Sequence, residues 1–311
     1  MLEQGHVPSP EAAEQAAKGF NAGEVIIGHV ANSSHDHPLI HLPTVLGIDF
    51  SITKHVFMLW LVAAVIFVGI TALVQAYIRR GRLVPTGAAG TLEFIVEFIR
   101  DDVARPSLGG KWTMVWTPLL LSIFVFILGA NVVGLLPIFD VVGLLNHFVH
   151  ASEESFMSRV VHGGSTITGN FNVTAGLAVV SFLAVVAAGT KKHGFIKHWV
   201  NLVPHGMPWA LYFLLIPLEV ISLFVRPFAL TMRLGANMMG GHIALLAIMS
   251  FVFVFAELLS SSFAGVGIGL FVSVPLSVGM SGLEIIVVIV QAYVFTLLTA
   301  VFMGMAIHAH H

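Results

Sequence analysis

The residues most able to do chemistry in this chain lie in one apolar stretch around Arg233. This arginine stands inside the segment RPFALTMRLGANMMGGH, residues 226–242, with apolar sequence on both sides. No acidic residue lies three or four positions away from it, and an arginine cannot lose its charge by deprotonation. A cation at the centre of a bilayer costs about 2.5–3.5 kcal/mol on insertion scales. Arg233 therefore needs water, a partner from another helix or a partner from another protein, which makes it a candidate functional residue.

Two further charges share the spacing of Arg233. Glu219, Arg226 and Arg233 follow one another at intervals of seven residues. Seven residues turn an α-helix through almost two full turns, so the three side chains share one face of a predicted helix. Asn237 extends this stripe. Successive charges lie roughly 10 Å apart along the axis, and we therefore expect no ordinary ion pair between them.

A second polar set begins with His242, nine residues after Arg233. Glu284 and Gln291, again seven apart, share one face of the last predicted helix. A buried carboxylic acid beside a histidine can pass protons, because imidazole titrates near neutral pH. We predict that His242 and Glu284 lie close together and reach water, with Gln291 and Glu257 as weaker candidates for the same path. The alternative is that each is a hydrogen-bonded polar group of the interior.

The composition is that of an integral membrane protein. Hydrophobic residues make up 57% of the 311 residues and charged residues 10%, with a mean hydropathy of +0.94, whereas soluble domains carry about 25% charged residues. The net charge of −2 gives no basic surface for nucleic acid. The absence of cysteine excludes disulfides, zinc–thiolate sites and iron–sulfur clusters. We predict no cofactor and no metal centre.

Residues 1–50 are polar and rich in His, Pro and Gly, and they lack the basic start and apolar core of a cleavable signal. We predict a loosely ordered segment on the outer side of the membrane, with a short helix at residues 10–19. A membrane domain follows over residues 51–311. The segment HDHPLIH, residues 35–41, has the side chains to bind a metal, but a solvated loop is the favoured interpretation.

Five apolar segments are long enough to cross the hydrocarbon core, which takes about 20 helical residues. They are predicted at residues 56–77, 117–138, 172–189, 209–259 and 283–307. The fourth is too long to stand upright in a bilayer, so we expect the last two helices to form a strongly tilted hairpin. The segment between them, residues 260–282, is rich in Gly and Ser and is predicted as a turn region.

Residues 92–103 carry apolar side chains at helical spacing with charged residues between them. This pattern predicts an amphipathic surface helix on the membrane, the alternative being a surface helix packed on other protein. The polar insertion at residues 139–169 is given no role. The predicted fold is thus all-α, with five membrane-crossing helices and one amphipathic surface helix.

Lysine and arginine indicate the orientation. Nine of them follow the first and third spans, and three lie on the opposite side. Cytoplasmic loops carry the excess of these residues. We therefore predict a periplasmic N-terminus and a cytoplasmic C-terminus.

The motif at residues 226–242 resembles the signature of subunit a of the F-type ATP synthases, and LEIIVVIVQAYVF, residues 283–295, resembles the final helix of that family. Shorter similarities are NVVGLLP at 131–137, FNVT at 171–174 and PLEVISLFVRP at 217–227. The likeness covers about residues 50–307.

By this resemblance, the essential arginine of the family corresponds to Arg233, its nearby asparagine to Asn237 and its glutamine to Gln291. Many bacterial members have an acid at the position of His242 and a histidine at that of Glu284. The acid and the histidine are thus exchanged here, an arrangement that resembles mitochondrial members.

The resemblance implies a subunit of the bacterial inner membrane that packs against a rotating ring of c subunits. Two offset aqueous half-channels lead protons to and from the ring carboxylates, and Arg233 separates the channels. The predicted proton pathway comprises His242, Glu284, Gln291 and Asn237, which the resemblance supports, together with Glu219 and Glu257, which are included for their positions in the sequence. The implied partners are the c-ring, subunit b of the peripheral stalk and the rest of the synthase. The chain itself would bind no nucleotide and catalyse no reaction alone.

A stand-alone ion channel or secondary transporter is the main alternative. It would need its own substrate site, usually within internal repeats, and no convincing repeat is found in the sequence. An intramembrane metalloprotease would need a motif such as HExxH, which does not occur. A purely structural subunit is disfavoured because Arg233 has no partner in its own helix.

Overall fold

The computed structural model describes Gly23 and residues 54–81, 84–135, 167–200, 209–258 and 262–308. All regular structure in these ranges is helical. The elements are α3 (Lys54–Arg80), α4 (Ala88–Glu97), the π-helix η1 (Phe98–Ala104), α5 (Arg105–Leu108), α6 (Gly110–Leu135), the 3₁₀ helix η2 (Ile167–Gly169), α9 (Phe171–His193), α10 (Phe195–Val200), α11 (Trp209–Leu258) and α12 (Ser262–Ile307).

Five of these helices are long and apolar enough to cross a membrane, which confirms the predicted all-α membrane fold. The spans are Val56–Arg79, Gly110–Leu135, Phe171–His193, Tyr212–Phe255 and Gly269–Ile307. The short helix predicted at residues 10–19 and the HDHPLIH segment lie outside the described residues, as does most of the insertion at residues 139–169. The predicted boundary at residue 50 stays a prediction.

The chain divides into two compact units. The larger unit comprises residues 32–240 and 284–311, and the smaller unit comprises residues 1–31 and 241–283. The first part of α11 and the last part of α12 therefore belong to the larger unit, together with all the helices from α3 to α10.

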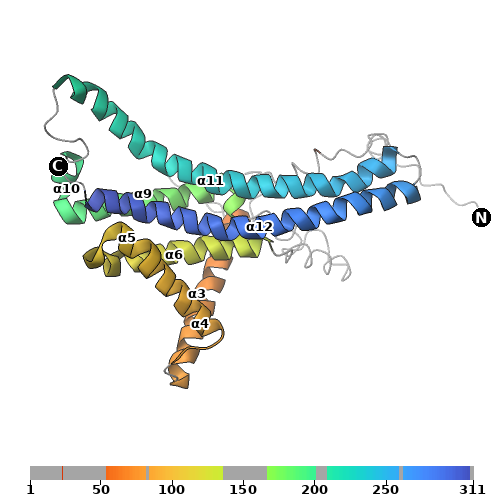
Figure 1. Cartoon of the computed structure of the whole chain (residues 1–311), viewed down its shortest axis with the longest axis horizontal. Coiled ribbons are helices and arrows are strands. Elements are labelled where there is room, and N and C mark those ends of the chain that lie inside the picture. Colours follow the sequence, from red (N-terminus) through yellow and green to blue (C-terminus); the bar gives the residue numbers. More distant parts are fainter. Residues whose placement is uncertain are drawn as a thin grey trace, which may run out of the picture. The chain divides into compact units, whose positions relative to one another are not determined.

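In the larger unit, α6, α9 and the C-terminal part of α12 lie side by side (Figure 1). Their shared core contains Leu120 of α6, Ala184 of α9 and Phe295 of α12, each less than 9% exposed. Small residues such as Ala184 allow neighbouring helices in a membrane protein to approach closely. Because lipid drives no hydrophobic association between helices, this close packing holds the bundle together.

The first span, α3, packs on α6 through a smaller core. Met58 and Val62 of α3 are buried with Ala130 of α6 and Ile167 of η2. Asn131, next to Ala130, is fully buried and accepts a hydrogen bond from Thr168 at 2.5 Å. Asn131 thus serves helix packing.

The amphipathic pattern of residues 92–103 is confirmed, but the segment is not one regular helix. It begins in α4 and continues as the π-helix η1. Ile99 and Val103 are fully buried in the core of the larger unit, whereas Glu93 and Glu97 are exposed. The apolar face therefore packs on the helices of this chain.

The predicted start of the second span was too late. Helix α6 begins at Gly110, directly after a turn at Gly109 with φ of +77°. Thr113 and Thr117 lie in its first turns, and their hydroxyls donate to the carbonyls of Gly109 and Thr113 at 2.9 and 2.7 Å. A threonine hydroxyl that donates to a carbonyl of its own helix can lie in an apolar span. The polar residues before position 117 therefore did not indicate where the helix begins.

The prediction of a turn region at residues 260–282 was wrong, because α12 runs without interruption from Ser262 to Ile307. Glycine and serine favour turns in water, but in hydrocarbon every backbone group must be bonded within the helix. The glycines instead allow close packing. In the smaller unit, a Cβ on Gly269 would lie 2.6 Å from the Cα of Val252 on α11.

Candidate functional site

Arg233 lies on an exposed face of α11 in the larger unit. Asn237, one turn further along, is exposed on the same face. Ala229, Ala236 and Gly240, also exposed, flank the arginine with small side chains. Among the described residues no ion pair to Arg233 is formed. The guanidinium is therefore accessible to water or to a partner from outside the described part of this chain.

Gly235 sets the other face of this segment against α9. A Cβ at position 235 would lie 2.9 Å from the ring of Phe171 and 3.3 Å from Oγ1 of Thr174. Leu234 beside it is fully buried. The glycine thus serves packing within this chain, and it leaves Arg233 on the opposite, open side.

The prediction that the stripe forms no ion pair was wrong for one pair. The guanidinium of Arg226 lies 3.4 Å from Oε1 of Glu219, and both side chains are 29% exposed. The axial separation of the two residues is bridged because both side chains are long and flexible. Arg226 also lies over the ring of Phe302 on α12, 5.3 Å from its centroid. The guanidinium of Arg226 thus contacts both a carboxylate and the face of an aromatic ring.

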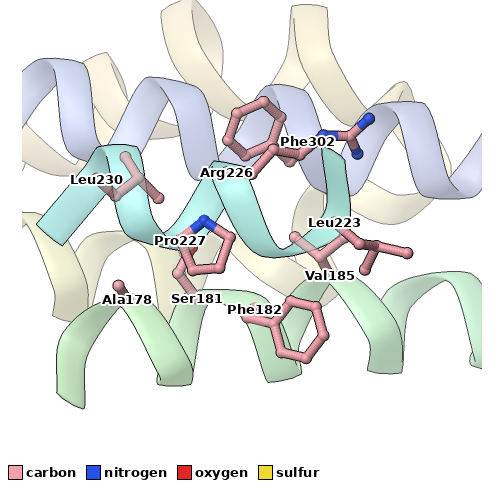
Figure 2. A pocket seen from close by; sticks show the side chains of 9 residues that line it. All are labelled: Ala178, Ser181, Phe182, Val185, Leu223, Arg226, Pro227, Leu230 and Phe302. Atoms are coloured by element: carbon pink, nitrogen blue, oxygen red, sulfur yellow. The ribbon is translucent and has the colours of Figure 1, made fainter. Parts of the chain in front are cut away.

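A small cavity of about 20 Å³ lies beside Arg226, between α9, α11 and α12 (Figure 2). Its volume is close to that of a single water. Pro227 on its wall has no backbone N–H, so α11 lacks one internal hydrogen bond at this level. The cavity is lined by Ala178, Ser181, Phe182, Val185, Leu223, Arg226, Pro227, Leu230 and Phe302.

Asn237 and Gln291 are brought together across α11 and α12. The Nδ2 of Asn237 donates to Oε1 of Gln291 at 3.1 Å. Gln291 is 4% exposed, whereas Asn237 is exposed. This contact connects the residue one turn after Arg233 to the last helix, so two of the predicted site residues are neighbours.

The remaining predicted residues lie in different parts of the chain. His242 is half-buried on α11 in the smaller unit, and Glu284 is half-buried on α12 in the larger unit. The prediction that these two side chains lie close together stays a prediction. Glu257 belongs to α11, and its side chain lies outside the described residues.

A polar contact between α9 and α12 was not predicted from the sequence. The hydroxyls of Ser181 on α9 and Thr299 on α12 lie 2.7 Å apart, and both residues are at most 1% exposed. Both lie in largely apolar segments of the sequence. A partner 118 positions away leaves no local signal in the sequence.

Comparison with known proteins agrees with the resemblance. The family model described as ATP synthase A chain matches residues 56–304. ATP synthase subunit a 2 of Chlorobium luteolum is 40% identical over 306 residues, which cover 96% of this chain and 80% of that protein. ATP synthase subunit a 2 of Prosthecochloris aestuarii is 37% identical over 304 residues, covering 95% of this chain and 83% of that protein.

Proposed function

Because this chain belongs to the ATP synthase A chain family, we propose that it translocates protons in an F-type ATP synthase and that Arg233 couples this flow to ring rotation. The chain is a multi-pass membrane protein and a component of a complex. The finer steps are the proposal: two offset half-channels reach the middle of the membrane, and each proton travels between them on a carboxylate of the c-ring.

The observation that carries the proposal is the exposed guanidinium of Arg233 on an apolar helix, which forms no ion pair with any residue that the structure describes. The small residues around it leave room for a helix of the ring to approach. A permanent cation favours the ionised form of a carboxylate that faces it, so a ring carboxylate must lose its proton before it passes. The same charge opposes direct passage of protons from one half-channel to the other.

The proposed outer half-channel uses His242 and Glu284 as titrating groups, with Glu257 and Gln291 along the same path. The hydrogen bond between Asn237 and Gln291 supports a polar connection from this path to the turn that follows Arg233. Glu219 is assigned to the cytoplasmic path.

The ion pair of Arg226 with Glu219 gives that carboxylate a partner.

The proposed partners are the c-ring, on the face of Arg233, and subunit b of the peripheral stalk. The proposed location is the inner membrane of a bacterium, with the N-terminus outside and the C-terminus in the cytoplasm. The excess of Lys and Arg after the first and third spans supports this orientation.

The test is the replacement Arg233→Ala in the intact complex, reconstituted into vesicles. We expect assembly without ATP synthesis, because no charge then separates the half-channels. Arg233→Lys should fail as well, since an ammonium cannot hold a carboxylate through a planar pair of hydrogen bonds. ATP formation and passive proton flux are measured together.

Arg79→Ala is the matched control, because Arg79 is an exposed arginine at the end of the first span, far in sequence from the proposed path. It should leave coupled synthesis unchanged. Normal synthesis by the Arg233→Ala complex would overturn the proposed mechanism.

A further inference from the structure

A second cavity, of about 300 Å³, lies between the end of α3 and the segment formed by α4 and the start of η1. Its volume is that of a small ligand site. The lining residues come from three stretches of the larger unit: Leu73, Val74 and Tyr77, then Pro85, Ala89, Leu92, Glu93, Val96 and Glu97, and finally Arg100. No residue of the proposed proton pathway is among them.

The wall of this cavity has both polar and apolar parts. Leu73 and Val74 belong to the apolar span Val56–Arg79, and Tyr77 lies two residues before its last residue. Tyrosine prefers this interfacial depth. We therefore expect the cavity to lie where phospholipid head groups meet their acyl chains.

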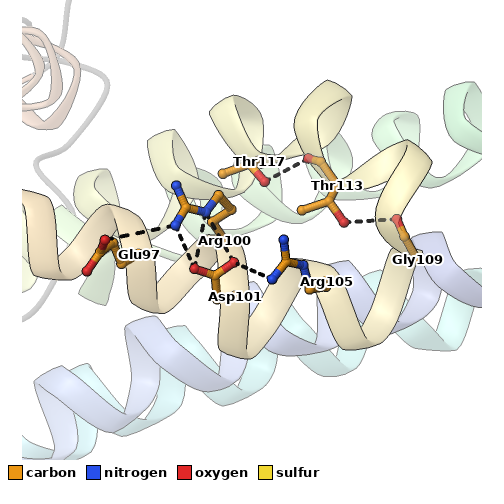
Figure 3. Close-up of polar contacts among 7 residues, drawn as sticks. All are labelled: Glu97, Arg100, Asp101, Arg105, Gly109, Thr113 and Thr117. Carbon is orange, nitrogen blue, oxygen red and sulfur yellow. Dashed lines mark hydrogen bonds and ion pairs between the residues drawn. The ribbon is translucent and has the colours of Figure 1, made fainter.

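The charged residues among the described lining are two carboxylates and one guanidinium. Glu93 and Glu97 lie one turn apart on α4, and both are exposed. Within the described ranges Glu93 forms no ion pair, and Glu97 lies 4.0 Å from Arg100. Arg100 is already held by Asp101 at 2.6 Å (Figure 3). Two carboxylates thus face one guanidinium whose charge is largely compensated.

The contact between Arg100 and Asp101 also favours the ionised form of the Asp101 carboxyl. Hydrogen bonding by the Arg100 guanidinium holds the pKa of the Asp101 carboxyl below its usual range. Arg105 adds a second contact to the same carboxylate at 3.2 Å. Asp101 therefore fixes the position of Arg100 at the edge of the cavity, with Glu97 on its other side (Figure 3).

We propose that this cavity binds a phospholipid whose head group carries a primary ammonium, of the phosphatidylethanolamine type. The ammonium has three N–H donors for the carboxylates of Glu93 and Glu97. Arg100 and the hydroxyl of Tyr77 are donors for the phosphate, and the first part of an acyl chain packs on Leu92, Val96 and Val74.

Two other kinds of lipid suit this wall less well. A choline head group has no N–H to donate to a carboxylate. Among the described lining residues, an anionic head group would meet two carboxylates and one guanidinium that is already paired with Asp101. The proposal is independent of the proton pathway, because it uses neither Arg233 nor the groups proposed to titrate.

The experiment uses the intact complex, purified in mild detergent and depleted of lipid. Dioleoylphosphatidylethanolamine and dioleoylphosphatidylcholine are titrated separately, and bound lipid is counted by native mass spectrometry, which also reports whether the complex is intact. We expect the ethanolamine lipid to bind at least about tenfold more tightly, the usual effect of one charge-assisted hydrogen bond. The double variant Glu93→Gln with Glu97→Gln should lose this preference.

The control Asp102→Asn removes an exposed carboxylate from the same segment without touching the cavity wall, and it should keep the preference. Ala89→Phe leaves both carboxylates in place but fills the cavity, and it should abolish tight binding of the ethanolamine lipid. Equal binding of the two lipids would overturn the proposal. So would a preference that survives either the double variant or Ala89→Phe.

Discussion

The hydroxyl pair of Ser181 and Thr299 connects α9 to α12 in the interior of the larger unit, and its strength can be predicted from its geometry. Thr299 donates its own proton to the carbonyl of Phe295 at 2.9 Å. The hydroxyl of Ser181 must therefore donate to Oγ1 of Thr299, 2.7 Å away. One hydrogen bond between helices depends on this serine.

Ser181→Ala removes the donor and leaves Thr299 bonded to its own helix. Interhelical hydrogen bonds in a membrane average about 0.6 kcal/mol and reach about 1.7 kcal/mol. Because both residues are at most 1% exposed, we expect a loss near the upper part of this range. Thr299→Val should cost about 1–2 kcal/mol, since it also leaves the Ser181 donor unpaired.

The measurement is a double-mutant cycle on the free energy of unfolding of the full-length chain, titrated from mixed micelles into denaturing detergent. The variants are Ser181→Ala, Thr299→Val and the two combined, and we expect a coupling energy of about 0.6–1.7 kcal/mol. Thr296→Val is the control, because the hydroxyl of Thr296 donates only to Ala292 of its own helix. It should be additive with Ser181→Ala. A coupling energy of zero for Ser181 and Thr299 would refute the reasoning.

Two further predictions concern titratable groups. Glu284→Gln, which removes an acid with little change of volume, should lower ATP synthesis in reconstituted vesicles while the complex still assembles; undiminished synthesis would remove Glu284 from the proposed path. On α10, burial of His198 against Gly189 and repulsion from His193 lower the pKa of His198, so the unfolded chain binds a proton more readily. Stability should be complete above about pH 6.5 and fall as the pH drops towards the folded pKa. The rate of amide hydrogen exchange in α10, corrected for its intrinsic pH dependence, should therefore increase as the pH is lowered from about 7 to about 5.5. The prediction would be contradicted if wild type showed no such increase, or if His198→Asn showed an equal one.

The sequence by itself determined the class of the protein and the residue on which its proposed function depends. Five long apolar runs require membrane helices, since no other open structure satisfies backbone groups in hydrocarbon. Arg233 could be singled out because an arginine without a local acid is costly at that depth. These inferences need only composition and local spacing.

The limits of α12 could not be obtained in the same way. Turn preferences of Gly and Ser are measured against water, whereas the segment from Ser262 onwards lies in an environment that enforces helical hydrogen bonding. The pairing of Glu219 with Arg226 was missed for a related reason. Helical spacing gives the positions of backbone atoms, but it does not give the reach of two long side chains.

Only the tertiary structure decided which polar groups meet. Asn237 bonds to Gln291 from 54 positions away, and Ser181 contacts Thr299 from 118 positions away. Such contacts depend on how three helices pack, and that packing is set by side-chain volumes spread along the whole chain. The structure likewise decided that Gly235 faces α9 and leaves Arg233 exposed. Periodicity can place both residues on one helix, but it cannot say which face the rest of the protein covers.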